Sequence, residues 1–342
     1  MKKYSFTYQL RRPYVGIEPG QSALQEALLV DIESWGASIP VRSSLFTANS
    51  SLKIILYRTP SEFKSFQKYF NPHKYRKYYL LVFELHGDIN ESKIEELITS
   101  LAEDEREEHS DYFKTYGAVN EIELEINNFF IAANIAFPGG ISTDNGASFY
   151  EEKYFTKIEG FYAEGIYSSV RIANDLKWPK LHNISILETL QWLNNNNFFI
   201  NGIAKNSIER ALAAFSHLII KNINDDRSLD LVWALLGLEA IYTKGNVGLK
   251  EQLTSKTETF LGSREENKKE FGKMYDFRSR FIHGDLDIPL HFHNSGAKEF
   301  EQFYDDLYRT TDIATITLIA TFQKMIINKW TNLSFKYSVE GS

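Results

Sequence analysis

The sequence contains no cysteine among its 342 residues. This absence excludes disulfide bonds, thiolate zinc sites, iron–sulfur clusters and cysteine nucleophiles. It also fits a reducing compartment, so we expect a cytoplasmic protein. Proline is scarce as well, with 8 residues, and almost none falls within the helical patterns of the C-terminal half. Long uninterrupted helices are therefore favoured there.

Long hydrophobic runs are also missing. The most apolar windows, residues 229–242 and 313–327, are interrupted by polar residues. Both are shorter than the about 20 apolar residues that a bilayer span needs. The first residues, Met1–Phe6, alternate polar and apolar side chains, unlike the core of a signal peptide. We therefore expect no membrane partner.

An excess of positive charge is absent, although many nucleic-acid-binding proteins carry one. The net charge is −7, which divides into −5 for residues 1–180 and −2 for residues 181–342. Acidic residues partly offset the most basic stretch of the second half, which contains Arg264, Lys268, Lys269, Lys273, Arg278 and Arg280. The net charge therefore weakens the case for nucleic-acid binding but does not exclude it, because a binding site needs positive potential only locally.

The first half of the chain has mixed α/β character. Alternating or β-prone segments predict strands at residues 2–9, 52–57 and 78–85, with further candidates at 149–156 and 160–167. Helices are expected to begin at Thr59–Glu62 and to follow Asn90 over residues 93–101. Residues 121–137 could form a strand or a helix, and we favour the helix. The acidic stretch 103–108 suggests a solvated helix face or loop.

From about residue 184 the hydrophobic period becomes helical. Six helices are predicted at residues 184–193, 207–221, 229–242, 249–261, 264–282 and 297–330. Ser207 is a plausible N-cap, and Gly262 and Gly284 suit positions just beyond helix C-termini. We expect an α+β protein, in which a mixed α/β domain (residues 1–180) precedes an all-α bundle (residues 181–342).

Two residues near the end of the fifth of these helices could carry chemistry. Arg278 and His283 are five residues apart, so an ideal helix separates them by about 140°. They would share a face only if the last turn loosens, which the following Gly284 permits. In the simpler interpretation, His283 caps the helix and Arg278 or Arg280 pairs with a nearby carboxylate. Spacing alone favours the simpler interpretation.

The surrounding residues resemble the Apea-like branch of the HEPN superfamily. The resemblance rests on Leu238-Glu239-Ala240-Ile241-Tyr242, on the helix at 249–261, and on the segment Met274-Tyr275-Asp276-Phe277-Arg278-Ser279-Arg280-Phe281-Ile282-His283-Gly284. It covers roughly residues 200–330, and nothing comparable is recognised in residues 1–180. The similarity implies a helical HEPN-type bundle that dimerises, bringing two such segments together in a shared cleft.

The resemblance also implies an activity. HEPN ribonucleases cut single-stranded RNA without a metal or cofactor, using the 2′-hydroxyl of the substrate as nucleophile. Carried over, His283 would be the general base or acid, and Arg278 would bind the scissile phosphate. Ser279 stands where many active members have Asn, Asp or His, and Glu239 would orient Arg278 or His283 or form a salt bridge. Tyr275, Arg280 and Lys273 would contact RNA, with core packing or solvent exposure as the alternative.

The implied biological role is that of an anti-phage or abortive-infection toxin. Residues 1–180 would then sense a phage-derived or protein trigger. The alternative is a non-catalytic HEPN module that binds RNA or a protein partner as a dimerisation scaffold.

Other candidate sites have weaker support. His291 and His293 alternate after Pro289, but no further ligand spacing completes a metal site, so no metal is expected. The turn at 245–248 lacks the Lys-Ser/Thr pair of a phosphate loop, and no Gly-x-Ser-x-Gly segment marks a serine nucleophile.

Overall fold

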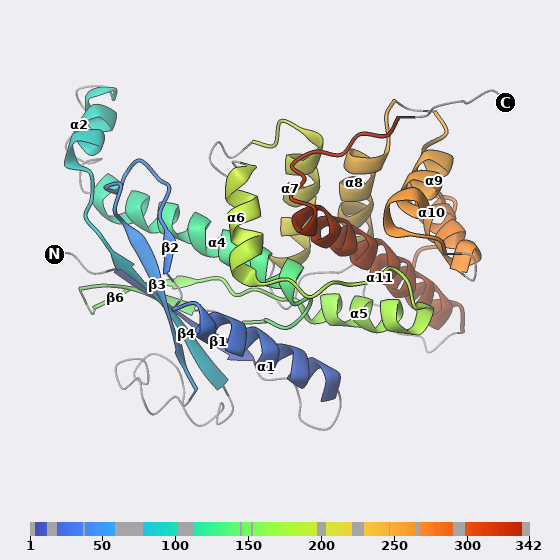
Figure 1. Ribbon diagram of the computed structural model, residues 1–342, viewed down its shortest axis with the longest axis horizontal. Coiled ribbons are helices and arrows are strands. Elements are labelled where there is room, and N and C mark those ends of the chain that lie inside the picture. Colours follow the sequence, from blue (N-terminus) through green and yellow to red (C-terminus); the bar gives the residue numbers. More distant parts are fainter. Residues whose placement is uncertain are drawn as a thin grey trace.

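The computed structural model describes residues 4–11, 19–36, 38–58, 78–101, 112–143, 146–151, 153–196, 203–220, 229–245, 247–264, 267–289 and 298–336. A sheet and a few helices come first in the chain, and helices make up the rest (Figure 1). The expected α+β class is therefore confirmed. None of the helices in these ranges is long and apolar enough to cross a membrane.

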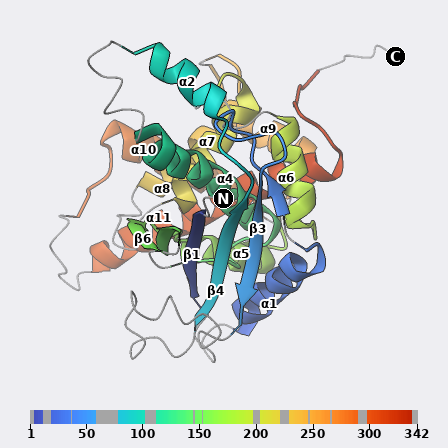
Figure 2. The same ribbon diagram turned by 90° about the vertical axis from the view of Figure 1, so that its left-hand side faces the viewer.

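Six strands form one antiparallel sheet in the order β2-β3-β4-β1-β5-β6. The strands are β1 (Tyr4–Arg11), β2 (Ser38–Pro40), β3 (Ser51–Tyr57), β4 (Tyr78–His86), β5 (Gly146–Tyr150) and β6 (Lys153–Ile158). Strands β1, β4 and β3 lie side by side in front of the helices in Figure 2. The strands expected at 2–9, 52–57 and 78–85 are confirmed, with small shifts at their ends.

Side chains alternate between the two faces of the sheet, as the period of a strand requires. In β4, Leu81, Phe83 and Leu85 belong to the main hydrophobic core. Leu80 instead joins Ala147 and Phe149 in a small separate cluster. Because β4 is buried by both clusters, it reads as a nearly continuous apolar run in the sequence.

Helices make up the remaining regular structure. They are α1 (Pro19–Ser34), α2 (Glu91–Thr99), the π-helix η4 (Phe113–Gly117), α4 (Ala118–Ala136), α5 (Glu164–Leu176), α6 (Ile186–Asn195), α7 (Ser207–Ile219), α8 (Asp230–Tyr242), α9 (Leu249–Leu261), α10 (Lys268–His283) and α11 (Lys298–Ile327). The helices expected at 93–101 and 121–137 correspond to α2 and α4. The six expected C-terminal helices correspond to α6–α11, and the element types are confirmed.

The segment at 160–167 corrects one prediction. Residues 159–163 form no strand, and Glu164 begins helix α5, which packs along α11. The aromatic residues Phe161 and Tyr162 suggested a strand, but the amphipathic helix that follows gains more by covering α11. The other candidate, 149–156, is the β5–β6 hairpin, with Glu151 at a positive φ of 48° in its turn.

Helix ends differ from expectation at two places. The N-cap of α7 is Asn206 rather than Ser207, because Asn206 and Glu209 form a complete capping box. Gly284 adopts the expected left-handed conformation after α10, whereas Gly262 has a φ of 102° and a ψ of 166°. Helix α1 was not expected, and the predicted elements at Thr59–Glu62 and 103–108 lie outside the described residues.

Helix α4 is buried almost all round and links the sheet to the C-terminal helices. Phe129 and Phe130 pack on Phe83 of β4, with ring centroids 5.2 and 6.1 Å away. Helices α6, α7 and α11 pack against other parts of α4. In addition, the Gln323 side chain of α11 donates to the carbonyl oxygen of Ile135 at 2.8 Å. One hydrophobic core thus runs across residue 180, and the two-domain division stays a prediction.

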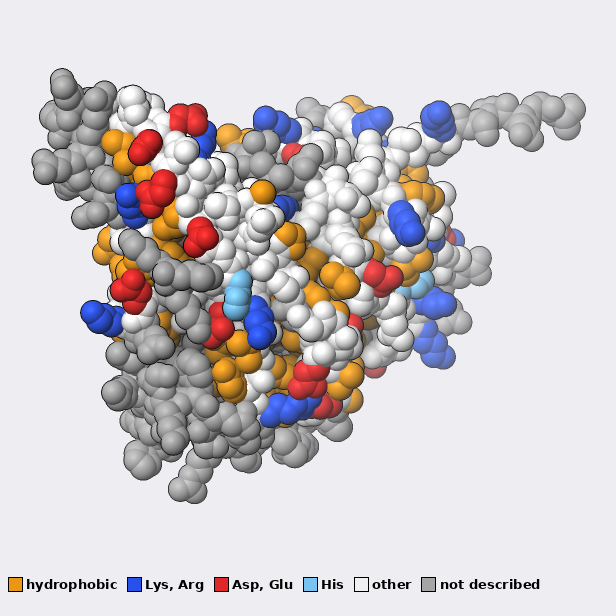
Figure 3. All heavy atoms as spheres, turned by 60° about the vertical axis from the view of Figure 1, so that its left-hand side comes forward, with side chains coloured by type: hydrophobic (Ala, Val, Ile, Leu, Met, Phe, Trp, Pro, Cys, Tyr) orange, Lys and Arg blue, Asp and Glu red, His pale blue; other side chains and the backbone are white. Residues whose placement is uncertain are grey.

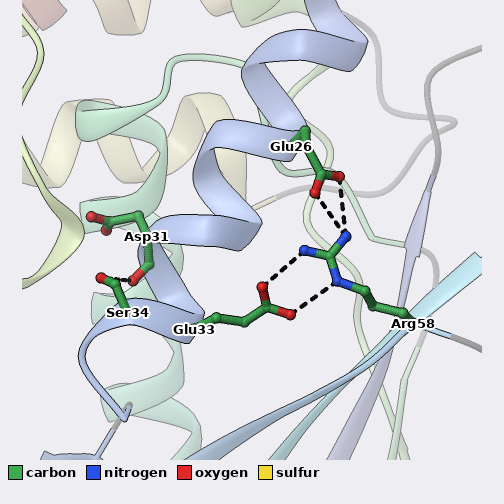
Figure 4. A network of polar contacts seen from close by, with 5 residues as sticks. All are labelled: Glu26, Asp31, Glu33, Ser34 and Arg58. Carbon is green, nitrogen blue, oxygen red and sulfur yellow. Dashed lines mark hydrogen bonds and ion pairs between the residues drawn. The ribbon is translucent and has the colours of Figure 1, made fainter.

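Polar contacts hold α1 in place at both sides. The Arg58 guanidinium donates to both oxygens of Glu33 at 2.9 Å and to Glu26 at 2.8 Å, which joins β3 to α1 (Figure 4). Asp31 accepts a hydrogen bond from the backbone N–H of Ile186, the first residue of α6, at 2.9 Å. Burial raises the pKa of Asp31, and this hydrogen bond opposes that effect. Helix α1 therefore connects the sheet to α6.

The α7 cap provides a test of the fold. Replacing Asn206 by Ala removes the oxygen that accepts from the Glu209 backbone N–H at 2.9 Å. We expect Asn206→Ala to lower the free energy of unfolding by about 1 kcal/mol in urea titrations. Ser207→Ala, at the position favoured by sequence, should change it by less than half of that. The opposite order of the two variants would contradict the observed cap.

Candidate functional site

Helix α8 places Glu239 by close packing of its own backbone. A Cβ added at Gly237 would lie 2.8 Å from Cδ2 of Leu318, so α8 and α11 approach each other closely there. The hydroxyl groups of Tyr242 and Thr321 form a buried hydrogen bond of 2.8 Å one turn further along. These contacts fix the axial position of α8. Glu239 lies between Gly237 and Tyr242 in the sequence, so these contacts also fix the position of its backbone.

Helix α10 is held by one apolar face. Phe271 and Met274 are buried, and Phe277 packs on Phe303 of α11 with ring centroids 5.9 Å apart. Arg278 follows Met274 by one helical turn, which puts it about 40° from the centre of this buried face. The charged side chain of Arg278 therefore lies near the edge of the buried face of α10 and extends toward α8.

Arg278 and Glu239 form a half-buried ion pair between α10 and α8. Nη2 of Arg278 donates to Oε2 of Glu239 at 3.3 Å and lies 3.2 Å from Oε1. The side chains are 25% and 15% exposed, so the pair is largely shielded from water. The guanidinium carbon also lies 5.8 Å from the centroid of the Tyr275 ring, at the outer limit of a cation–π contact. Three of the predicted site residues are thus brought together.

Burial dominates the electrostatics of this cluster. It raises the pKa of Glu239, and the neighbouring Arg278 cation opposes the rise. Burial also raises the pKa of Tyr275, with a further contribution from the charge of Glu239. Oε1 of Glu239 is buried and accepts no hydrogen bond in the described structure, so its one polar contact there is the ion pair with Arg278. The carboxylate consequently depends on Arg278 to remain charged.

His283 is not brought to Arg278 within one chain. Helix α10 stays α-helical through His283, and the N–H groups of Gly284 and Asp285 both donate to the carbonyl oxygen of Arg280. The last turn has therefore not loosened, and Arg278 and His283 remain about 140° apart around the helix. The imidazole is exposed and forms no hydrogen bond or ion pair with any part of the chain that the structure describes.

The remaining predicted RNA contacts are distributed over the surface of α10. Lys273 pairs with Glu270 at 3.0 Å, and Glu270 also accepts from Arg309 at 2.7 Å. Arg280 is exposed and donates to the carbonyl oxygen of Asp285 at 3.3 Å, while Ser279 is half-buried. Lys273 is partly neutralised, so Arg280 is the more available cation.

On the face shown in Figure 3, acidic and basic side chains are interspersed among the coloured residues, without a broad patch of one sign.

Arg264 does not belong to the basic surface that the sequence suggested. It is only 2% exposed and lies over the Phe271 ring, 4.1 Å from its centroid. Its Nη1 donates to the Thr257 hydroxyl at 2.9 Å, and burial lowers its pKa. The Phe271 and Trp178 rings around it could not be identified as neighbours from sequence spacing. Arg264 therefore has a structural role just before α10, and its buried guanidinium is not available to bind a ligand.

No group of three or more metal-ligating side chains gathers within the described ranges, and His291 and His293 lie outside them. Comparison with known proteins gives no match with a family model, a curated protein or a solved structure. The resemblance set out above consequently stays a prediction that rests on the residues quoted for it.

The ion pair can be tested through stability. Arg278→Met leaves the buried Glu239 carboxylate without its cation, and we expect about 2 kcal/mol of unfolding free energy to be lost at pH 7. Burial would then raise the pKa of Glu239 further above its unfolded value. A carboxyl with a raised folded-state pKa destabilises as pH rises, so the deficit should shrink toward pH 4.

Two further variants make this test specific. Arg280→Met removes an exposed cation from the same helix and should cost little at any pH. The double variant Arg278→Met/Glu239→Gln should recover part of the lost stability, because no unpaired charge remains. Equal losses in Arg278→Met and Arg280→Met in urea titrations would contradict the ion pair as described.

Proposed function

We propose that this protein is a metal-independent endoribonuclease of HEPN type that cuts single-stranded RNA. In the reaction, the 2′-hydroxyl oxygen attacks the adjacent phosphorus and loses its proton, and the 5′-oxygen leaves and gains one. The products are a 2′,3′-cyclic phosphate and a 5′-hydroxyl end. Because the nucleophile belongs to the substrate, DNA would not be cut.

The observation that carries the proposal is the way Arg278 is held. Glu239 contacts only Nη2 of the guanidinium, and Nη1 and Nε have no partner among the described residues. A half-buried guanidinium with free N–H groups suits a phosphate oxyanion, because shielding from water strengthens the charge-assisted hydrogen bonds. The ion pair with Glu239 restricts the motion of the Arg278 guanidinium but leaves its other N–H groups accessible to a ligand. Arg278 is therefore proposed to bind the scissile phosphate.

His283 supplies a proton acceptor and donor at the end of the same helix. It is the last residue of α10, and Gly284 turns the chain away in a left-handed conformation. An exposed imidazole can accept the proton of the 2′-hydroxyl and later donate one to the leaving oxygen. His283 is proposed as the general base and acid, with Ser279, Tyr275, Arg280 and Lys273 in supporting or RNA-binding positions.

We further propose that each active site uses two copies of the chain. Within one copy, Arg278 and His283 face different directions, so a second copy is required to bring both groups to one phosphate. Leu229, the N-cap of α8, and Leu236 on α8 are 57% and 47% exposed, and Val232 and Trp233 between them are half-buried. A two-fold homodimer that covers this apolar stripe would place two copies of α10 close together.

The wider role follows from the resemblance. A ribonuclease of this kind would serve as a cytoplasmic toxin in anti-phage defence by abortive infection, with residues 1–180 sensing a phage-derived or protein trigger. A second candidate function, a non-catalytic scaffold that binds RNA or a protein partner, is favoured by one observation. The single carboxylate of Glu270 on α10 already pairs with both Lys273 and Arg309. That network leaves less positive charge for RNA.

Cleavage of single-stranded RNA in the presence of EDTA tests the activity. We expect the protein to generate 2′,3′-cyclic phosphate ends, and His283→Ala and Arg278→Ala each to lower the rate at least about a hundredfold. His86→Ala, an exposed histidine on the sheet, should retain the full rate. Retardation of intact RNA without cleavage would support the scaffold instead, and equal cleavage by His283→Ala would remove the assignment.

Mixing the two inactive variants tests the shared site. If each site takes Arg278 from one copy and His283 from the other, half of the mixed population pairs the variants and has one intact site of two. We therefore expect about a quarter of the normal activity to return after co-expression. No recovery, with mixed dimers detected by mass spectrometry, would show that each copy carries its own site.

A further inference from the structure

A pocket of about 680 Å³ lies far along the chain from α10, at the junction of α4, α2 and the segment after β2. The α4 residues that line it recur at helical spacing and therefore share one face: Asn120, Glu121, Leu124, Glu125 and Asn128. The volume is within the range of small-molecule sites in proteins.

Asn128 is the unusual group in this pocket. It is 2% exposed, and its Oδ1 atom is buried without any hydrogen-bond partner in the described structure. Its Nδ2 faces Oε2 of Glu125 at 3.5 Å, so rotating the amide would only turn an oxygen toward a carboxylate. A buried acceptor without a donor costs about 1–3 kcal/mol. A ligand that brings an N–H group would recover this cost.

Three of the four charged side chains that line the pocket form ion pairs within the described structure, and Glu121 is the exception. Glu125 accepts from Nε of Arg42 at 3.1 Å and from Nη2 at 2.9 Å, a forked ion pair that occupies both partners. Lys93 pairs with Glu96 at 2.7 Å. The described wall therefore offers no unpaired cation for a phosphate, and the Glu121 carboxylate would repel one, so a ligand without a negative charge fits best.

Aromatic side chains form the other wall of the pocket. Tyr112 and Phe113 line it beside Leu45 and Leu97, and Tyr112 stacks on Tyr116 with centroids 5.7 Å apart. They lie at the start of η4, and π-helical turns often occur at functional sites. Exposed aromatic rings beside hydrogen-bonding amides are the arrangement that binds planar nucleobases.

We infer that this pocket binds an uncharged nucleoside whose base carries an exocyclic amino group, and that the amino group donates to Oδ1 of Asn128. Adenine and cytosine have such a group. The base stacks on the aromatic wall, and the sugar lies toward the polar side chains of Ser43 and Asn120. The site is independent of the proposed nuclease, since none of its lining residues belongs to α8 or α10.

Calorimetric titration with adenosine and cytidine tests the site. At least one should bind at one equivalent per chain, and N6,N6-dimethyladenosine, which lacks the donor, should bind at least about tenfold more weakly than adenosine. AMP should bind no more tightly than adenosine. No binding of either nucleoside up to about 1 mM, or a tenfold preference for AMP, would overturn the inference.

Variants assign the binding to Asn128. Asn128→Leu puts an apolar group of similar size in place of an amide whose Oδ1 is unpartnered and whose Nδ2 makes only one long contact, so it should keep the melting temperature and weaken binding at least about tenfold. Asn127→Leu alters a half-buried neighbour that does not line the pocket and should bind normally. His283→Ala should also bind normally, which separates failure of this site from failure of the nuclease. Equal binding by Asn128→Leu would overturn the assignment.

Discussion

Both parts of the chain depend on the burial of helix α4. Its aromatic residues Phe129 and Phe130 cover the sheet, while α6, α7 and α11 pack against it elsewhere. A helix that is apolar on most of its circumference cannot remain in water, so the sheet and the C-terminal helices must both form around it. The contacts of α1 through Arg58 and Asp31 reinforce the same junction. The core is for this reason one unit across residue 180.

Local pattern was sufficient to predict most of the fold, because strand and helix periods differ clearly over 8–15 residues. Prediction from local pattern failed where a neighbouring residue determined the helix cap, or where a surface far away in the sequence determined the type of element. Asn206 caps α7 because Glu209, three residues later, completes the box, which the pairing of Ser207 with Arg210 cannot do. Residues 164–167 looked extended, but α5 forms there because α11 offers an apolar surface to cover. That surface comes from residues more than a hundred positions later.

The candidate site could be predicted only in part for a related reason. The pairing of Glu239 with Arg278 follows from two adjacent helices that each present a polar residue near the core, and it was among the expected alternatives. The separation of Arg278 from His283 depends on whether the last turn of α10 remains helical, which Gly284 leaves open. Arg264 was misassigned to the surface, because the rings of Phe271 and Trp178 that shield it come from different segments.

Two arginine–glutamate pairs in this chain show how geometry separates a structural cation from an available one. Arg42 meets Glu125 through a fork of Nε and Nη2, and the backbone N–H of Arg42 donates to the same carboxylate. Such a pair satisfies both groups, so neither Arg42 nor Glu125 offers an unpaired charge to the pocket beside it. Arg278 instead meets Glu239 through Nη2 alone, at the longer distance of 3.3 Å. That pair fixes the position of the guanidinium and leaves Nη1 and Nε without a partner among the described residues, which is the property that the proposed phosphate site requires.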